Sequence, residues 1–186
     1  MQWFPRLELS WQNGWVFLVI FYGVYGLLLW AFPHDVVARL YDRSGWSQRQ
    51  SRLSAMRLFF ILPTLAMMVL SPLKVGANVF LVGTATFALG LLGFGVALLN
   101  FRDTPPGRPA TSGLYRVSRN PQVITLFLAS YGICIAIGSW LAVLTLFLAQ
   151  LCAHFRILAE EGSCLRQYGD SYRAYVQSVP RYFWLF

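Results

Sequence analysis

Two polar blocks stand out in this otherwise apolar chain, because both hold residue types that can bind a charged ligand. Residues 113–121 read GLYRVSRNP, and residues 156–175 read RILAEEGSCLRQYGDSYRAY. Arginine and asparagine offer donors, glutamates offer acceptors, and tyrosine rings can stack on a base or face a cation. Such an inventory fits a cofactor with an aromatic base, ribose hydroxyls and a charged tail.

The adjacent acids Glu160 and Glu161 directly follow an apolar run. Arg156 and Glu160 lie four residues apart and share one helix face, so an ion pair on a solvated helix would account for Glu160 without a ligand. Glu161 has no basic residue four positions before or after it. Because an unpaired, partly desolvated carboxylate is costly, its charge needs a partner elsewhere in the fold or in a ligand. We expect the ligand.

A catalytic triad and a metal site are not recognisable in the sequence. His34 and His154 stand far apart and without a nucleophile at a familiar spacing, so we interpret both as interfacial or core residues. The cysteines Cys134, Cys152 and Cys164 lack the spacing of metal ligands, and we interpret them as small core residues. We therefore expect no metal.

The composition excludes an ordinary soluble domain. Of the 186 residues, 57% are hydrophobic, 17% aromatic and only 12% charged. The net charge of +8 could indicate a nucleic-acid partner, but the basic residues fall in short loops between apolar runs rather than in one stripe. We expect an all-α integral membrane protein that forms a single domain over residues 1–186 and has no nucleic-acid partner.

Three apolar runs in the first hundred residues can cross a bilayer: residues 10–33, 58–73 and 75–101. The second run contains Pro63 and reaches the roughly 20 residues of a spanning helix only when it is extended back to residue 54. In the third run, Gly83, Gly90, Gly93 and Gly95 indicate close packing of helices.

The connections between these runs are also predictable. A short interfacial helix over residues 36–41 and a turn at Gly45 should join the first two runs. The prolines and glycine of residues 102–108 require a loop after the third.

The region between the two polar blocks predicts a helical hairpin. Residues 120–155 contain no Asp, Glu, Lys or Arg. A single helix of this length would measure about 54 Å, well beyond the roughly 30 Å hydrocarbon core, so the segment must fold back. We place the turn at Gly138 and Ser139, which gives five spans and brings the two blocks together at one membrane face. Beyond them, Gly169 should end the last helix and Asp170 should N-cap a short cytoplasmic one.

The basic residues of the loops predict the orientation of these five spans. Thirteen of the 15 fall on one side, and only Arg6 and Lys74 fall on the other. By the positive-inside rule, the N-terminus is outside, and the C-terminus and both polar blocks are cytoplasmic. The thirteen are Arg39, Arg43, Arg49, Arg52, Arg57, Arg102, Arg108, Arg116, Arg119, Arg156, Arg166, Arg173 and Arg181.

The C-terminal half, about residues 102–186, resembles the isoprenylcysteine carboxyl methyltransferase and phospholipid methyltransferase family of integral membrane enzymes. The family pattern is G-x-Y, R-H-P-x-Y, a helical hairpin, R-x-x-x-E-E, Y/F-G-x-x-Y-x-x-Y and V-P-R. It is matched here in order and spacing, from Gly113-Leu114-Tyr115 to Val179-Pro180-Arg181. Two positions depart from the pattern: Asn120 replaces His and Val123 replaces Tyr. Asn120 can still form hydrogen bonds but cannot titrate near neutral pH.

The resemblance implies a methyltransferase that uses S-adenosylmethionine. Its acceptor would be small, lipophilic or membrane-embedded, like an isoprenylcysteine carboxylate or a phospholipid, and would enter from the bilayer. The expected catalytic residues are Arg119, Arg156 and Glu161. The expected cofactor-binding residues are Gly113, Leu114, Tyr115, Asn120, Pro121, Gln122, Glu160, Glu161 and Tyr172.

Two alternatives stay open at this stage. Membrane sterol-type reductases resemble the family in their C-terminal helices and bind NADPH there, and Arg116 and Arg119 could serve its 2′-phosphate. A non-enzymatic membrane protein could also have retained the helices. The cofactor that stabilises the purified protein distinguishes the three.

Overall fold

The structure is a computed structural model that describes residues 1–42 and 48–183. The described residues are predominantly α-helical, as the sequence predicts, and none of them belongs to a β-strand. The turn expected at Gly45 lies outside the described residues. The elements are α1 (Trp15–Ala31), α2 (His34–Tyr41), α3 (Gln48–Leu70), α4 (Asn78–Arg102), the 3-10 turn η1 (Gly113–Arg116), α5 (Pro121–Ala136), α6 (Trp140–Tyr168) and α7 (Asp170–Ser178).

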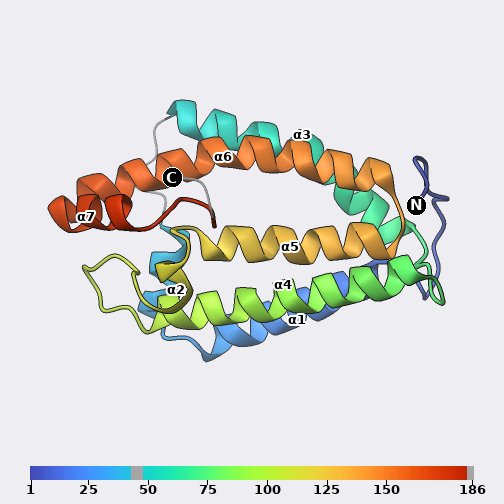
Figure 1. Ribbon diagram of the computed structural model, residues 1–186, viewed down its shortest axis with the longest axis horizontal. Helices are drawn as coiled ribbons and strands as arrows, with labels where there is room; N and C mark the ends of the chain where they lie inside the picture. The colour runs from blue at the N-terminus through green and yellow to red at the C-terminus, as the bar shows by residue number, and fades with distance from the viewer. Residues whose placement is uncertain (43–47, 184–186) are drawn as a thin grey trace.

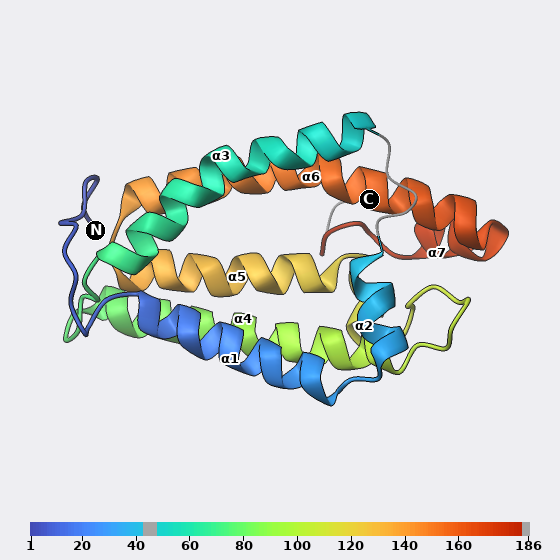
Figure 2. The same cartoon turned by 180° about the vertical axis from the view of Figure 1, so that it is seen from behind.

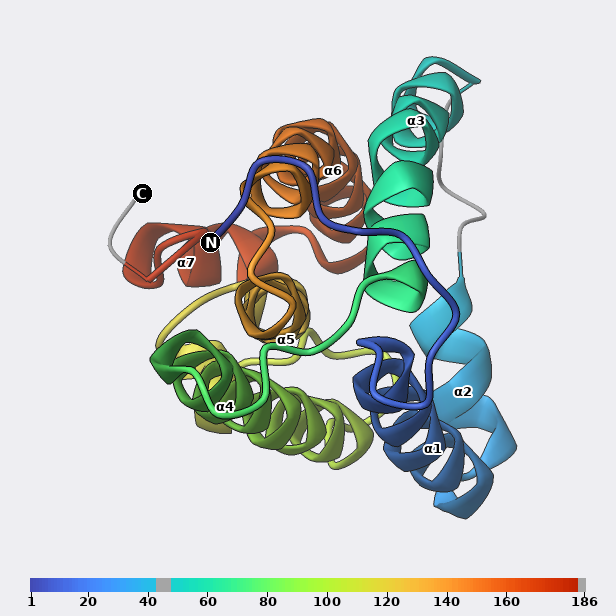
Figure 3. The same ribbon diagram turned by 90° about the vertical axis from the view of Figure 1, so that its right-hand side faces the viewer.

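The long helices run along the long axis of the molecule in two groups. α3 lies beside α6, while α4 lies between α5 and α1 (Figures 1 and 2). The view along the axis shows α5 next to both α4 and α6, and α2 beside α1 (Figure 3). Figure 2 shows that α2 lies across the end of α1. The short helix predicted over residues 36–41 is present as α2, and the predicted loop over residues 102–108 separates α4 from η1.

The predicted hairpin is confirmed. α5 ends at Ala136 and α6 begins at Trp140, so the turn falls at Gly138 and Ser139. Gly138 adopts a φ of 69°, which a residue without a Cβ reaches at little cost. The Ser139 hydroxyl caps α6 by accepting a hydrogen bond from the Ala142 amide at 3.1 Å. Local turn chemistry therefore fixes where the apolar segment folds back.

Small residues bring α4 and α5 unusually close together, as predicted from Gly83, Gly90 and Gly93, whereas Gly95 is not closely packed: the atom nearest to a Cβ there is 3.9 Å away. A Cβ on Gly83 would collide with the backbone of Ala136, and one on Gly90 would collide with the backbone of Ala129. From the other side, a Cβ on Gly132 would collide with the backbone of Phe87. The two backbones are thus in direct contact along this seam, which is typical of helix packing in membranes.

The last helix of the hairpin does not stop where the apolar run stops. α6 continues through the second polar block for 29 residues in all. Gly169, with a φ of 56°, ends it as predicted, and α7 folds back from that point. The N-cap expected at Asp170 is wrong: Gly169 is the flanking residue, Asp170 begins α7, and its carboxylate accepts from Arg173 Nη1 at 3.3 Å.

The outer faces of the helices are apolar. Phe59 on α3, Leu27 on α1 and Leu92 on α4 each expose more than 60% of their surface, which is unusual for a water-soluble monomer. Among the described residues, α4 and α6 are long and apolar enough to cross a membrane, and α1, α5 and Ala55–Leu70 of α3 are shorter apolar helices. These surfaces indicate a membrane protein.

Candidate active site

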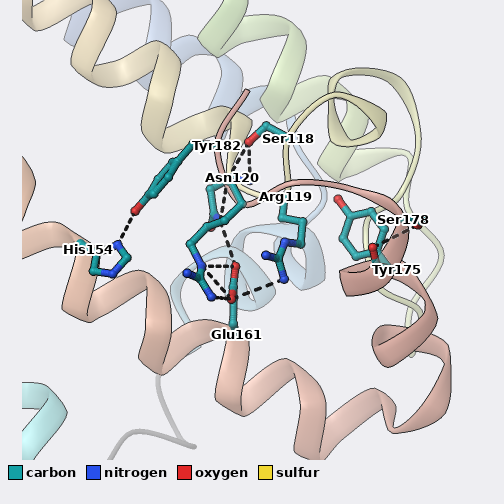
Figure 4. A network of polar contacts seen from close by, with 9 residues as sticks. Ser118, Arg119, Asn120, His154, Glu161, Tyr175, Ser178 and Tyr182 are labelled. Atoms are coloured by element: carbon teal, nitrogen blue, oxygen red, sulfur yellow. Dashed lines mark hydrogen bonds and ion pairs between the residues drawn. The ribbon is translucent and has the colours of Figure 1, made fainter. Parts of the chain in front are cut away.

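The two polar blocks meet, as predicted. η1 and the first residues of α5 face the polar end of α6, and the chain beyond α7 returns between them (Figure 4). We call this returning segment, residues 179–182, the strap. The meeting point depends on the helical hairpin, because α5 begins and the apolar part of α6 ends at the same level of the molecule (Figure 1).

Glu161 is the centre of the polar network. Its side chain is buried, with 7% of the residue surface exposed. Arg181 binds it with two nitrogens: Nε lies 3.1 Å from each carboxylate oxygen and Nη2 lies 2.9 Å from Oε2. Arg119 Nη1 lies 3.6 Å from Oε2, and Asn120 Nδ2 donates to Oε1 at 3.4 Å. Glu161 therefore has protein partners, where we expected the cofactor to match its charge.

The strap is held against the segment that precedes α5 and against α6. The Arg119 amide donates to the Pro180 carbonyl at 3.0 Å, and the Ser118 hydroxyl donates to the Arg181 carbonyl at 2.9 Å. Tyr182 shares a hydrogen bond of 2.8 Å with His154 Nδ1 on α6. The hydrogen bond with Glu161 raises the pKa of Arg181, so this guanidinium stays charged.

Arg119 keeps unused hydrogen-bonding capacity in a buried position. Only 3% of its side chain is exposed, and no described residue accepts a hydrogen bond from its Nε or Nη1. Since buried donors are normally satisfied, these two, of which Nη1 has only the 3.6 Å ion pair with Glu161, point to an acceptor that the described residues do not provide. The carboxylate of an amino-acid ligand is one such group.

A cluster of tyrosines lies next to Arg119. Tyr115, Tyr172 and Tyr175 are all buried, and the rings of the last two are 5.7 Å apart. Tyr175 donates to the Tyr115 carbonyl at 2.6 Å, which fastens α7 to η1. Burial raises the pKa of each of the three hydroxyls, so they remain neutral donors. Figure 4 shows Arg119 between Tyr175 and Glu161.

Gly113 and Leu114 hold η1 in place. The Leu114 amide donates to Asn100 Oδ1 on α4 at 2.9 Å. Gly113, with a φ of 59°, lies so close to the Asn100 side chain that a Cβ would collide with it. The structure does not bring these two residues into the Glu161 network.

The remaining expected site residues lie beside the network. Arg156 Nε donates to Glu160 Oε1 at 2.7 Å, so the ion pair expected from their spacing is confirmed. Both side chains are about 30% exposed. Pro121 is the first residue of α5, and Gln122 and Arg156 line a cavity of about 230 Å³ between the helices. The expected site is thus divided between the network and this cavity.

Ser118 and Arg181 are members of the site that sequence reasoning did not assign. Arg181 belongs to the V-P-R element, so a signal was present, but its spacing from Glu161 fits no helix face because α7 and a turn intervene. Ser118 lies inside the first polar block and carries no signal of its own. Among the residues that the structure describes, no group of three or more His, Cys, Asp or Glu could hold a metal ion.

The sequence that forms this site matches a known protein family. The family model described as phospholipid methyltransferase matches residues 66–171, more than half of the chain. The chain belongs to the phospholipid methyltransferase family. This confirms the resemblance seen in the sequence and identifies a membrane methyltransferase. No curated protein and no solved structure matches the chain.

The phospholipid methyltransferase match covers only part of the site. It includes α4, α5 and α6, and with them Arg119, Asn120 and Glu161. Arg181, α1 and α2 lie outside it. The family match therefore includes the network residues before α5 and on α6, but it does not include the strap, α1 or α2.

Proposed function

We propose that this protein is an S-adenosylmethionine-dependent methyltransferase that acts on a lipophilic acceptor within the membrane. The observation that carries the proposal is the pair of buried Arg119 donors, Nε and Nη1, from which no described residue accepts a hydrogen bond, beside a tyrosine cluster and within a matched methyltransferase region. The group contains two arginines and one glutamate, so it has a net positive charge that favours an anionic ligand group.

The residues present fit S-adenosylmethionine part by part. Nε and Nη1 of Arg119 suit the carboxylate of its methionine portion. The rings of Tyr115 and Tyr172 suit an adenine face or a cationic sulfur. Glu160, which is about 30% exposed, can accept from ribose hydroxyls, and the backbone at Asn120, Pro121 and Gln122 can border the adenosyl group.

Glu161 and the η1 turn act indirectly in this proposal. Glu161 holds Arg119 and Arg181 in place, and Gly113 and Leu114 hold the ring of Tyr115 by fixing η1 on α4. Arg156 faces the cavity, where it can orient an anionic group of the acceptor. When bound, S-adenosylmethionine supplies a methyl group on a positively charged sulfur.

Methyl transfer depends more on aligning the two reactants and excluding water from the site than on a general base. Positive charge is lost from sulfur as the methyl group moves, so a site that excludes water and aligns the two reactants can supply much of the acceleration. The strap and the tyrosines cover the network and bury Arg119. Asn120, which cannot titrate near neutral pH, is compatible with an acceptor that carries its own negative charge.

We further propose that α1, α3, α4, α5 and α6 all cross the membrane, with the site and strap on the cytoplasmic side and the N-terminal segment outside. The exposed apolar faces and the uneven distribution of arginine and lysine support this arrangement. The acceptor would then reach the site from the bilayer, and the cofactor from the cytoplasm.

The first test is which cofactor stabilises the purified protein in detergent. We expect S-adenosylmethionine to raise the melting temperature in a concentration-dependent way, and NADPH to leave it unchanged, because a ligand stabilises only the folded state that it binds. Stabilisation by NADPH alone, or by neither ligand at millimolar concentration, would overturn the proposal.

The second test is Arg119→Lys. Lysine keeps the charge but loses the planar set of donors, so S-adenosylmethionine binding should weaken by about ten-fold or more. Arg116→Lys is the matched control, because Arg116 is exposed on the neighbouring turn and should bind the cofactor like the unmodified protein. Equal affinity in both variants would remove Arg119 from the cofactor site.

A further inference from the structure

The N-terminal segment, which we define as residues 1–14, belongs neither to the site nor to the family match. The structure describes all of these residues, and they form no helix. The segment lies beyond the ends of the long helices and passes across α6 and α3 before it enters α1 (Figures 1 and 3). It therefore covers the end of the molecule that is opposite the site.

Backbone hydrogen bonds fasten the N-terminal segment to the helices that it crosses. At its start, the Gln2 amide donates to the Gly138 carbonyl at 2.6 Å, and the Trp140 amide donates to the Gln2 carbonyl at 2.8 Å. Further along, the Glu8 amide donates to the Leu70 carbonyl at 2.7 Å. The segment is thus held by the hairpin turn and by the end of α3.

Asn13 fixes the other end of the segment. Its side chain is buried, and its Nδ2 donates to the carbonyls of Glu8 and Val69. The Gly14 amide donates to the Ser71 carbonyl at 3.1 Å. Because the backbone is held at both ends and in the middle, the fold itself determines which way the side chains of the segment point.

This segment points large apolar side chains outward. Five of them expose between 60% and 86% of their surface: Trp3, Phe4, Leu7, Leu9 and Trp11. A contiguous apolar surface of this kind marks a contact with a protein or a membrane. The charged side chains of the segment are Arg6 and Glu8, which cancel. The contact is therefore apolar rather than electrostatic.

The lengths of α1 and α5 favour a membrane as the partner. With 17 and 16 residues, these helices measure about 25 Å and about 24 Å, whereas the hydrocarbon core measures roughly 30 Å. α5 begins at the polar network, so its missing length falls at the hairpin turn, where Gln2 is bound. α1 begins directly after the segment. The segment thus adds an apolar layer at the end where both helices are too short.

Tryptophan is concentrated at this end of the molecule. The rings of Trp3 and Trp140 are 6.5 Å apart, and those of Trp11 and Trp15 are 6.3 Å apart. Indole rings collect where acyl chains meet head groups, because they combine a large apolar surface with one N–H donor. This composition favours a lipid leaflet over a second protein.

We propose that the N-terminal segment is a non-helical anchor that lies between the head groups and the acyl chains, completes the apolar height of the bundle and sets its depth in the membrane. The partner is the leaflet at the end opposite the site, and neutral lipid is sufficient because the charges of the segment cancel. The inference goes beyond the proposed function. It rests on the crossings proposed there, but not on the cofactor or the acceptor.

The first test reads the depth of the segment with NBD labels in phosphatidylcholine bilayers. A label on Leu9→Cys should be quenched more by lipid with a nitroxide near the head group than by lipid with a nitroxide near the chain ends. Leu92→Cys, in the middle of α4, should show the reverse order, and Arg108→Cys, in the loop after α4, should be quenched by neither lipid. The unmodified protein, labelled in parallel, gives the contribution of the native cysteines.

Access of aqueous cobalt(II) to the same labels identifies the other possible surroundings. The inference is overturned if cobalt(II) quenches position 9 as strongly as position 108, because the segment then lies in water. It is also overturned if lipid nitroxides and cobalt(II) are both excluded from position 9, because a second copy or another protein then covers it. Failure at position 9 alone leaves the crossings and the methyltransferase proposal standing. Failure of lipid quenching at position 92 removes the crossings, and this inference with them.

The second test varies the thickness of the bilayer. The combined variant Phe4→Ser, Leu9→Ser and Trp11→Ser has a shorter apolar height. It should therefore melt at a higher temperature in thin dimyristoleoyl phosphatidylcholine than in dioleoyl phosphatidylcholine, and the unmodified protein should show the opposite order. The matched control is Leu89→Ser with Leu92→Ser, which removes side chains that are 65% and 67% exposed in the middle of α4. It should lower both melting temperatures without changing their order. The same order in the unmodified protein and the combined variant would overturn the role of the segment in setting depth.

Discussion

At the scale of single residues, the site is a buried group of three charges. Glu161 lies between Arg119 and Arg181, and only Arg181 has a substantially exposed side chain, at 25%. Burying ions costs several kcal/mol each unless they are well paired, so the loss of one partner is more harmful than the loss of the whole group. A substitution of any one of the three charged residues should therefore destabilise the folded protein.

Glu161→Gln should destabilise the protein even without cofactor. The change leaves Arg119 buried without a counter-charge and removes the two-pronged bond with Arg181, so we expect the free energy of unfolding to fall by about 2 to 3 kcal/mol. Thermal or denaturant unfolding in detergent measures the loss. Glu160→Gln, whose ion pair is partly exposed, should cost less than about 1 kcal/mol. Equal stability of the two variants would contradict the network described here.

The sequence predicted that Glu161 needs a partner, and we expected that partner to be the ligand, whereas in the structure Arg181 and Arg119 pair with its carboxylate. The sequence shows a carboxylate at the end of an apolar run, and the free-energy cost of burying that charge can be judged from the neighbouring residues alone. The partner Arg181 is visible only after α7 has folded back and the strap has returned, since that distance depends on two turns and on packing. The Arg156 and Glu160 pair was predictable because one helix face is enough to define it.

At the scale of elements, the α4 and α5 pair is held by contact between backbones rather than by long side chains. Residues 83, 90 and 132 are glycines at the points of closest approach. Periodic glycines in an apolar run predicted such packing, but they did not show which helix would be the neighbour. That choice depends on the turn at Gly138 and on the loop after α4, which together set how α5 returns.

Gly90→Ala should weaken this seam. Its new methyl group would overlap the backbone of Ala129, so the helices must separate, at a cost of about 1 to 3 kcal/mol. Gly95→Ala is a control within the same helix, because the nearest atom to its new Cβ is 3.9 Å away. We expect a lower melting temperature for the first variant and no loss for the second. A similar effect of both would mean that helix propensity, not the seam, governs stability.

The attachment of α7 should depend on pH in the alkaline range. The pKa values of Tyr115, Tyr172 and Tyr175 are raised in the folded protein above the ordinary value near 10, because burial disfavours the phenolate. Their contribution to stability is therefore complete below pH 10 and is lost as the pH rises above it, since the unfolded chain releases these protons first.

Tyrosine absorbance and unfolding, followed together between pH 8 and 12, check this dependence. The Tyr175→Phe variant should show a shallower loss of stability above about pH 10 than the unmodified protein. Ionisation of all tyrosines near pH 10 with no change in stability would contradict the burial of this cluster.

At the scale of the whole molecule, the five apolar helices were predictable from four apolar runs, of which the last, residues 120–155, is too long for one crossing. Their ends were less predictable. The helix of residues 10–33 begins only at Trp15, and α6 continues well beyond Phe155 into the polar block. Hydrocarbon length limits only the apolar part of a helix, whereas hydrogen bonding and caps decide where the helix itself stops.

The orientation that we propose from the distribution of basic residues can be tested with reporters. A reporter fused after residue 186 should be cytoplasmic, and one inserted within residues 70–76, between α3 and α4, should be external. Protease accessibility or a compartment-sensitive fluorescent reporter gives the location. Both reporters on the same side would exclude five crossings and a cytoplasmic site.

The hairpin turn at Gly138 and Ser139 also has a mechanical consequence. Between the turn and the site, the Tyr131 hydroxyl on α5 donates to Gln150 on α6 at 2.8 Å. At the far ends of the two helices, Glu161 contacts Asn120 and Arg119. The two helices are therefore connected by the turn at one end and by the contacts of Glu161 at the other. Separating the far ends of α5 and α6 therefore requires that the contacts of Glu161 with Asn120 and Arg119 break first.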